Sequence, residues 1–166
     1  YDLPELICCV EQYPDFLALY DEKYLYRYTN NTAVCFYSYD NEFDGPQGLD
    51  NAIRYNDVKR LQYYKNRFAG VKYIITPEYS VFGDVHRIEN LHRTFRSRIV
   101  GLWFLFEIGA VVIPNVSCGK LEDLAYVLDG LDGCTVIALS TKGHADSKAK
   151  RQSLVNKVRL IVERLH

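Results

Sequence analysis

The sequence predicts an α/β protein that forms a single domain, with a mostly parallel sheet and helices on both of its faces. Short apolar segments rich in β-branched and aromatic residues alternate with longer segments whose apolar residues recur at helical spacing. This alternation favours parallel strands joined by right-handed crossovers. The length of 166 residues fits one domain. An arrangement resembling half of a β/α barrel is the alternative, because the strand order cannot be read from the sequence.

The first 32 residues form an acidic, tyrosine-rich lead with little regular periodicity. Within it, residues 6–10 suit a short strand and residues 16–20 suit a helical turn. The α/β core is expected over residues 33–166, and it starts with a strand over 33–39, where aromatic and β-branched residues predominate. Glycines and a proline favour a loop over residues 41–50.

Helical periodicity extends over residues 49–68, with a break at Asn56, and Asp57 is a suitable N-cap for the second part. After a strand over 71–76, a long helix over 84–108 ends at Gly109, because glycine commonly closes a helix in the left-handed conformation. The remaining predicted elements are a strand over 110–113, a helix over 121–128, a strand over 134–139 and a helix over 147–165.

The helix over 84–108 has a clear apolar stripe. At about 100° per residue, six apolar side chains fall in one narrow sector: Ile88, Leu91, Phe95, Ile99, Leu102 and Phe106. We expect this stripe to be the core face of the helix. Since Arg96 and Arg98 flank the stripe, at least one of them should be buried and bonded to Glu78, Asp40 or a strand-end carbonyl.

Charge is distributed unevenly along the chain. The net charge is −1, but residues 1–50 carry ten acids and two bases, whereas residues 51–166 carry eleven acids and eighteen bases. Either the acidic lead neutralises the basic body, or one of the two poles meets a partner. The longest apolar run, residues 99–106, is far shorter than the roughly 20 residues that span a bilayer, so we expect no membrane association.

The chain has five cysteines, an odd number, and no C-x-x-C pair. This pattern argues against a disulfide framework and against a structural zinc site, and it fits a reducing cytoplasm. Cys35 and Cys134 lie inside apolar segments and are expected to be buried thiols. We expect neither a metal ion nor a cofactor.

Polar residues follow several predicted strands, where α/β proteins commonly build their sites. The candidates for catalysis are Asp40, Glu78, Arg96 and Asn115. Asp40 and Glu78 can form a carboxylate pair for acid–base or metal chemistry, or each can cap a helix or pair with an arginine. Asn115 can orient a ligand or join two loops.

The candidates for binding include three cations of the long helix, Arg93, Arg96 and Arg98, together with Asn115. Ser140 and Lys142 lie in a loop with glycine after a predicted strand, a composition that suits phosphate. In the lead, Tyr24 and Tyr26 alternate with charged or aliphatic residues. In an extended segment their rings would share one face with Tyr28.

Three motifs, P-[DE]-[FY]-S, R-x-R-x-x-G-x-W and G-x-x-V-I-P-N-V, resemble those of a domain-of-unknown-function family found in phages and mobile elements of bacteria, mainly Gram-positive ones. The residues that carry the resemblance are Phe68, Gly70, Pro77, Tyr79, Ser80, Arg96, Arg98, Gly101, Trp103, Gly109, Pro114, Asn115 and Val116. It covers about residues 33–145 and implies a compact α/β domain in a phage or mobile-element setting. It implies no established activity.

Two functions stay open, and the sequence does not decide whether the protein is an enzyme. The first is a phage or mobile-element accessory protein that binds a macromolecule, most concretely a host protein whose defence function it inhibits. The second is an enzyme or binder that acts on nucleotides or nucleic acid at the carboxyl ends of the strands. An open cleft that holds Glu78, Arg96 and Asn115 favours the second, whereas a closed polar network favours the first.

Overall fold

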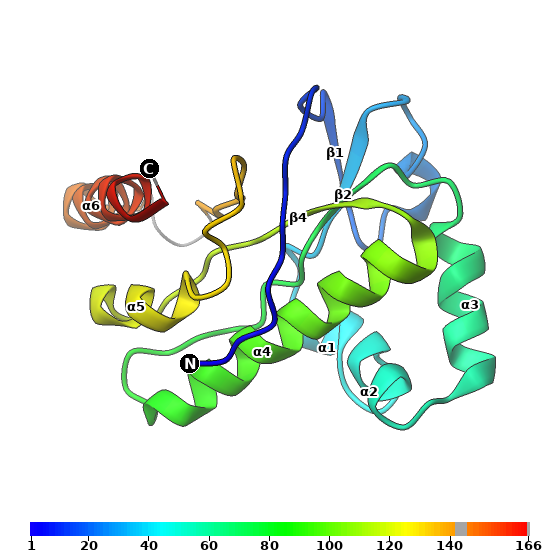
Figure 1. Cartoon of the computed structure of the whole chain (residues 1–166), viewed down its shortest axis with the longest axis horizontal. Coiled ribbons are helices and arrows are strands. Elements are labelled where there is room, and N and C mark those ends of the chain that lie inside the picture. Colours follow the sequence, from blue (N-terminus) through cyan, green and yellow to red (C-terminus); the bar gives the residue numbers. More distant parts are fainter. Residues whose placement is uncertain (142–145, 166) are drawn as a thin grey trace.

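A four-stranded sheet lies at the centre of the protein (Figure 1). The structure is a computed structural model that describes residues 1–141 and 146–165. The strands are β1 (Phe16–Leu19), β2 (Thr32–Cys35), β3 (Tyr73–Ile75) and β4 (Val111–Ile113). All are parallel, and each pairs with the next one in the sequence. The α/β class and the parallel sheet are confirmed, and the strand order is the one that successive strands of a β/α barrel follow.

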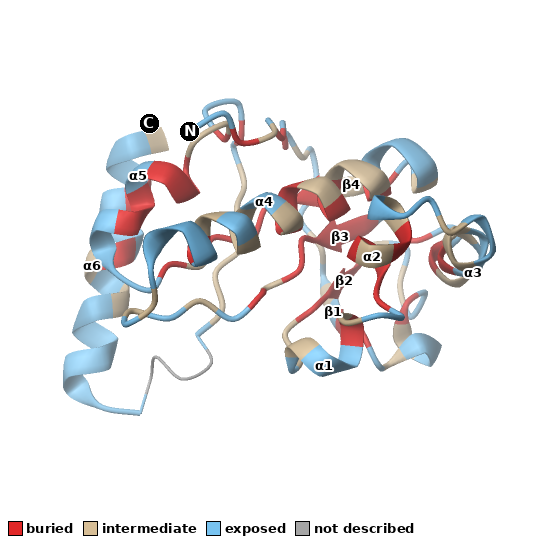
Figure 2. Ribbon diagram, turned by 90° about the horizontal axis from the view of Figure 1, so that it is seen from below, coloured by how far each residue is buried: buried red, intermediate tan, exposed pale blue. Residues whose placement is uncertain are grey.

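Helices occupy the connections between strands and the C-terminal part of the chain. They are α1 (Asp40–Phe43), α2 (Leu49–Arg54), α3 (Val58–Phe68), α4 (Arg87–Trp103), α5 (Leu124–Val127) and α6 (Lys148–Leu165). Two 3₁₀ turns, η1 (Lys23–Leu25) and η3 (Leu121–Asp123), and the π-helical η2 (Phe104–Ile108) complete the helical elements of the described residues. In Figures 1 and 2, α5 and α6 lie together at one end of the molecule, and α3 lies at the other.

Local end signals account for the helix boundaries that the sequence predicts correctly. Asp57 caps α3, since its carboxylate accepts a hydrogen bond from the backbone N–H of Arg60 at 3.1 Å. Gly109 closes the α4–η2 helix at φ +71°, where glycine meets no steric penalty. Both features depend on residues within one helical turn, which is why they can be read from the sequence.

Four local predictions are wrong. Residues 16–20 form β1 rather than a helical turn, because Ala18 and Tyr20 are buried while Leu17 and Leu19 are exposed, the period of a strand. The expected loop over 41–50 contains most of α1 and the start of α2. The expected strand over 134–139 makes a single parallel bridge, from Ala138 to Asn115, and residues 6–10 form no regular strand.

Both faces of the central strands are buried, since every residue of β2 and β3 is buried. On one face the strand register places Val34, Ile74 and Val112 side by side. Phe68 of α3 and Phe104 at the start of η2 pack against this region with their rings 4.8 Å apart. Figure 2 shows the central strands as buried. Helix α4 approaches the sheet closely at Gly101, where a Cβ atom would lie 2.8 Å from Thr76 Cγ2.

The expected core face of α4 is wrong. Ile88, Phe95 and Phe106 are 62%, 40% and 77% exposed. The buried residues of α4 are Asn90, Ser97, Arg98, Val100 and Gly101. Hydrogen bonds satisfy two of the buried polar side chains: Ser97 donates to the Pro77 carbonyl, and Asn90 donates to the Phe82 carbonyl, each at 2.8 Å. Small and hydrogen-bonded side chains, together with Val100, therefore face the core. Ile88 and Phe95 face outward, whereas Leu91 and Leu102 are half-buried and pack against the core.

Among residues 1–141 and 146–165, no helix combines the length and the apolar character that a bilayer span requires.

The cysteines provide a test of the packing. Cys9 is exposed, whereas Cys8, Cys35, Cys118 and Cys134 are buried, as expected for Cys35 and Cys134. Burial raises the pKa of Cys8 to about 12 and that of Cys35 to about 11, which suppresses their thiolates at neutral pH. We expect a thiol reagent at pH 8 to label Cys9 alone rapidly in the folded protein, and Cys9→Ser to remove this phase. Fast labelling of a second cysteine, followed by mass spectrometry, would contradict the packing.

Candidate functional site

The polar residues after β3 and β4 are bonded to one another. The backbone N–H of Asn115 donates to Thr76 Oγ1 at 2.9 Å, and the hydroxyl of Tyr37 donates to Asn115 Oδ1 at 3.2 Å. Asn115 is 9% exposed and also pairs with Ala138 through the isolated bridge. Burial, followed by the nearby charge of Glu78, raises the pKa of Tyr37, so this hydroxyl stays a donor. Asn115 therefore joins three segments.

Asp40 holds the loop that follows β3. Its carboxylate accepts hydrogen bonds from the backbone N–H of Ser80, at 3.2 Å to each oxygen, and from Ser80 Oγ at 3.0 Å. Arg93 of α4 donates to the Ser80 carbonyl and places its guanidinium 5.0 Å from the centre of the Phe82 ring. Glu78 belongs to the same loop and is half-buried. Asp40 and Arg93 thus fix the backbone around Ser80.

Arg96 forms the strongest ionic network of this region. Its guanidinium pairs with Asp44, just after α1, and with Asp50 Oδ2 of α2 at 2.9 Å, and it lies 4.3 Å from the centre of the Tyr79 ring. The side chains of Arg96, Asp44 and Asp50 are only 17%, 17% and 6% exposed. Burial opposes the charge of Arg96, but Tyr79, Asp44 and Asp50 outweigh it, so the pKa of Arg96 is raised.

Arg98 is 2% exposed, so the prediction that one of the two arginines is buried is confirmed. The predicted partners are wrong. Arg98 Nη2 donates to the Val127 carbonyl of α5 at 2.7 Å, and its buried Nη1 has no hydrogen-bond partner among the described residues. Burial lowers the pKa of Arg98 to about 10. The partners of Arg98 differ from the predicted ones because its side chain points toward α5. On the neighbouring Arg96, Asp44 and Asp50 form the ion pairs.

The two predicted tyrosines of the lead differ in burial. Tyr24 is 81% exposed, whereas Tyr26 is 1% exposed, stacks on Phe68 at 5.2 Å and donates to the Tyr20 carbonyl. The expected shared face of the tyrosines is wrong, because residues 23–25 form a 3₁₀ turn instead of an extended segment. Ser140 is half-buried, and Lys142 lies outside the described residues.

Little space remains at the ends of β3 and β4. A cavity beside Asn115, Arg93 and Ser97 has a volume of about 20 Å³, which is room for about one water molecule. Within the described residues, no group of three or more His, Cys, Asp or Glu side chains is arranged to hold a metal ion. The polar side chains at these strand ends therefore act on one another and hold loops together.

The outer face of α4 is a second candidate, which sequence reasoning assigned to the core. We call six apolar residues of the continuous α4–η2 helix the α4 stripe: Ile88, Leu91, Phe95, Ile99, Leu102 and Phe106. Three of them are exposed, and the half-buried Leu91, Ile99 and Leu102 lie between them. Arg87 and His92 are exposed beside the N-terminal half of the stripe. The signal for this surface was present in the sequence as helical spacing, but spacing alone does not tell a core face from an interface.

Comparison with known proteins identifies a family but no activity. No curated protein and no solved structure matches the chain. The family described as Domain of unknown function (DUF4417) matches residues 1–166, so the match includes the acidic lead as well as the part that carries the sequence motifs. Because the match carries no source, the phage or mobile-element setting stays a prediction. The chain belongs to the DUF4417 family of domains of unknown function.

Proposed function

We propose that this protein acts by binding another protein through the α4 stripe. The observation that carries the proposal is the orientation of α4, which buries Asn90, Ser97 and Gly101 while it exposes Ile88 and Phe95. A helix on the surface of a soluble domain normally has the opposite orientation. Contiguous apolar side chains on a surface are a common mark of a protein interface.

The energetic argument favours a partner that covers the stripe. Removing one Phe or Ile side chain from water contributes about 1.5–3 kcal/mol, and Ile88, Phe95 and Phe106 are all accessible for such burial. The stripe spans 19 residues of continuous helix, α4 followed by η2, or about 28 Å at 1.5 Å per residue. This length suits a helix-in-groove contact, in which spaced apolar side chains act as anchors.

The closed network at the ends of β3 and β4 argues against a catalytic site there, and so supports a protein that acts by binding. Asp40, Arg96 and Asn115, three of the candidates for catalysis, are already bonded within the protein. An enzyme of this class would instead present such groups to a substrate in a cleft at the strand ends.

The charges beside the stripe define the partner further. Arg87 lies beside its N-terminal half, so the complementary surface is an apolar groove with an acidic rim. In the phage or mobile-element setting that the sequence motifs imply, this partner is a host protein, and an inhibitor of host defence is the most concrete version of the proposal. Charges at the rim act mainly on the association rate, so association should slow as salt is raised.

Paired substitutions test the stripe. Phe106 and Tyr55 are aromatic residues with nearly equal exposure, 77% and 76%, but only Phe106 belongs to the stripe. We expect Ile88→Ser with Phe106→Ser to weaken partner binding by about a thousandfold, since two anchor residues at about 2 kcal/mol each contribute about 4 kcal/mol together. Tyr55→Ser should leave the affinity unchanged, and each variant should melt cooperatively.

The partner is identified with a photo-crosslinking residue at position 106 or 95, and at position 55 as the control, in a nuclease-treated host lysate. A protein crosslinked from the stripe positions and absent from the control is then purified for affinity measurements with the variants. Unchanged affinity in the stripe variant, with a normal melting curve, would show that binding occurs elsewhere.

A further inference from the structure

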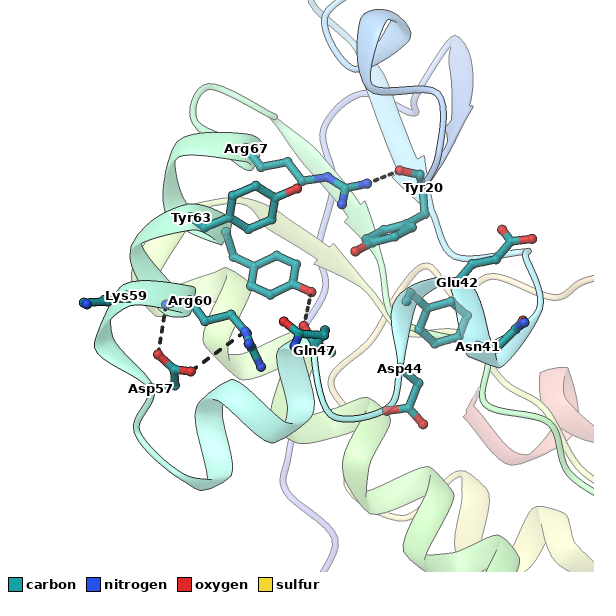
Figure 3. A pocket seen from close by; sticks show the side chains of 13 residues that line it. Tyr20, Asn41, Glu42, Asp44, Gln47, Asp57, Lys59, Arg60, Tyr63 and Arg67 are labelled. Atoms are coloured by element: carbon teal, nitrogen blue, oxygen red, sulfur yellow. Dashed lines mark hydrogen bonds and ion pairs between the residues drawn. The ribbon is translucent and has the colours of Figure 1, made fainter.

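A cavity of about 650 Å³ opens on the side of the sheet where β1 and β2 end (Figure 3). Tyr20, which follows β1, and Phe43 of α1 line one side, and α3 lines the other. The volume lies within the range of about 300–1,000 Å³ that is typical of ligand sites. The position also agrees with the rule that ligands of parallel α/β sheets bind beyond the carboxyl ends of the strands. This cavity is separate from the closed network around Asn115 and from the α4 stripe.

Arg67 gives the cavity a cation without an acidic partner. Its guanidinium lies 3.8 Å from the centre of the Tyr20 ring, and Nη2 donates to the Tyr20 carbonyl and to the Tyr26 hydroxyl. These acceptors are neutral. Arg67 forms no ion pair with any Asp or Glu of the described chain, and its buried Nε has no hydrogen-bond partner there. A partly buried cation of this kind is stabilised by an anion.

The other charges around the cavity do not neutralise Arg67. Of the three acids that line it, Asp57 pairs with Arg60, and Asp44 pairs with Arg96. Lys59 is exposed at the edge of the cavity. Lys23 does not line the cavity, but its Nζ donates a hydrogen bond to the Tyr63 hydroxyl at 3.3 Å. Burial acts to raise the pKa of Tyr63, but the hydrogen bond from Lys23 and the nearby charges of Arg67 and Lys23 outweigh burial and lower it.

Aromatic side chains supply the second feature of the site. Tyr20, Phe43, Tyr63 and Tyr64 all line the cavity. The Tyr63 ring is 49% exposed, so it has a face for a ligand, and Figure 3 shows Tyr63 and Arg67 opposite Tyr20. Stacking of a nucleobase on an aromatic side chain contributes about 1–3 kcal/mol. Phosphate pairs well with a guanidinium.

We propose that the cavity between α1 and α3 binds a nucleoside phosphate, with the phosphate at Arg67 and the base against Tyr63. The nucleotide is either free or the end of a single strand, because both present the same chemistry. Lys59 attracts the anion to the cavity, and Asp44, Asp57 and Glu42 limit how many phosphates enter.

The sequence contains a signal for this site that was missed. Lys59, Tyr63 and Arg67 recur every four residues and therefore share one face of α3. Tyr20 is 47 residues away from Arg67, so no local pattern connects the two sides of the cavity.

The test is calorimetric titration with the four nucleoside triphosphates, their monophosphates, a short single-stranded DNA and RNA, and inorganic phosphate. We expect saturable binding of a nucleotide, weaker binding of inorganic phosphate, and weakening with salt. Tyr63→Ala should weaken nucleotide binding by about tenfold, the effect of one lost stacking contact. Lys59→Gln should weaken it by a smaller factor. The matched control is Lys65→Gln, which removes the same charge from the same helix. Lys65 lies outside the cavity and pairs with Glu107.

Arg67→Gln serves as a further variant only if its melting curve shows a folded protein, because Arg67 also contacts Tyr26 of the core. Saturation by mononucleotides identifies a free nucleotide as the ligand, and saturation by oligonucleotides alone identifies a strand end. No binding of any probe at about 1 mM, or equal affinity in wild type and Tyr63→Ala, would overturn the proposal. Phe106→Ser should not change nucleotide binding, so failure here is distinguishable from failure of the α4 stripe.

Discussion

Arg96→Ala should lower the free energy of unfolding by about 3–5 kcal/mol, the usual effect of removing one member of a buried ion pair. Without the guanidinium, Asp44 and Asp50 are left close together, and Asp50, with its side chain only 6% exposed, keeps Arg54 at 3.3 Å as its remaining cation. Chemical denaturation measures the loss. Arg87→Ala removes an exposed arginine of the same helix and should stay within about 0.5 kcal/mol of wild type.

A double-mutant cycle separates the ionic effect from the packing of the Arg96 side chain on Tyr79. If unpaired carboxylates cause the loss, Asp50→Asn should recover part of the stability in the Arg96→Ala background, although it destabilises the wild type. An unchanged melting temperature in Arg96→Ala would show that the network contributes nothing to stability, and additive effects of the two substitutions would show that the residues are not coupled.

Arg98→Ala should destabilise the protein by about 2–4 kcal/mol, because it leaves a cavity beside α5 and removes the donor to the Val127 carbonyl. Arg98→Met should lower the free energy of unfolding much less than Arg98→Ala does. Methionine fills most of the space and eliminates a buried charge that forms no ion pair with a described carboxylate, and such replacements are often neutral or stabilising.

Comparison of the two Arg98 variants by denaturant titration distinguishes packing from charge. Equal losses in Arg98→Ala and Arg98→Met would mean that the guanidinium itself is needed, and the uncompensated-charge argument would be wrong. A melting temperature unchanged in both Arg96→Ala and Arg98→Ala would contradict the burial of the arginine pair altogether.

The two proposed surfaces use different parts of the chain. The α4 stripe is apolar and is flanked by Arg87, whereas the cavity at α3 combines aromatic rings with Arg67. A protein partner and a nucleotide can therefore be tested independently, with Phe106→Ser and Tyr63→Ala as reciprocal controls. This separation also means that neither proposal relies on the closed network around Asn115, to which the sequence motifs pointed first.

Local sequence patterns predict the α/β class and helix ends such as those at Asp57 and Gly109. They also predict the parallel strands over residues 33–39, 71–76 and 110–113 to within a few residues. These features depend on β-branched runs, caps and glycine conformations, which act over a few neighbouring residues. The burial of one of the two arginines was also predictable, because both lie in a helix that had to contact the sheet.

Contacts between distant segments determine which side of α4 is buried and which acids pair with Arg96. They also place Tyr26 in the core while Tyr24 stays exposed. Helical spacing finds an apolar stripe but does not reveal what covers it. Here Gly101 and Ser97 allow α4 to approach the sheet with its polar, small face, and hydrogen bonds to Pro77 and other loop carbonyls compensate for the burial. Those partners come from segments distant in the sequence, so the orientation of α4 is set by tertiary packing and cannot be read from the residues of the helix alone.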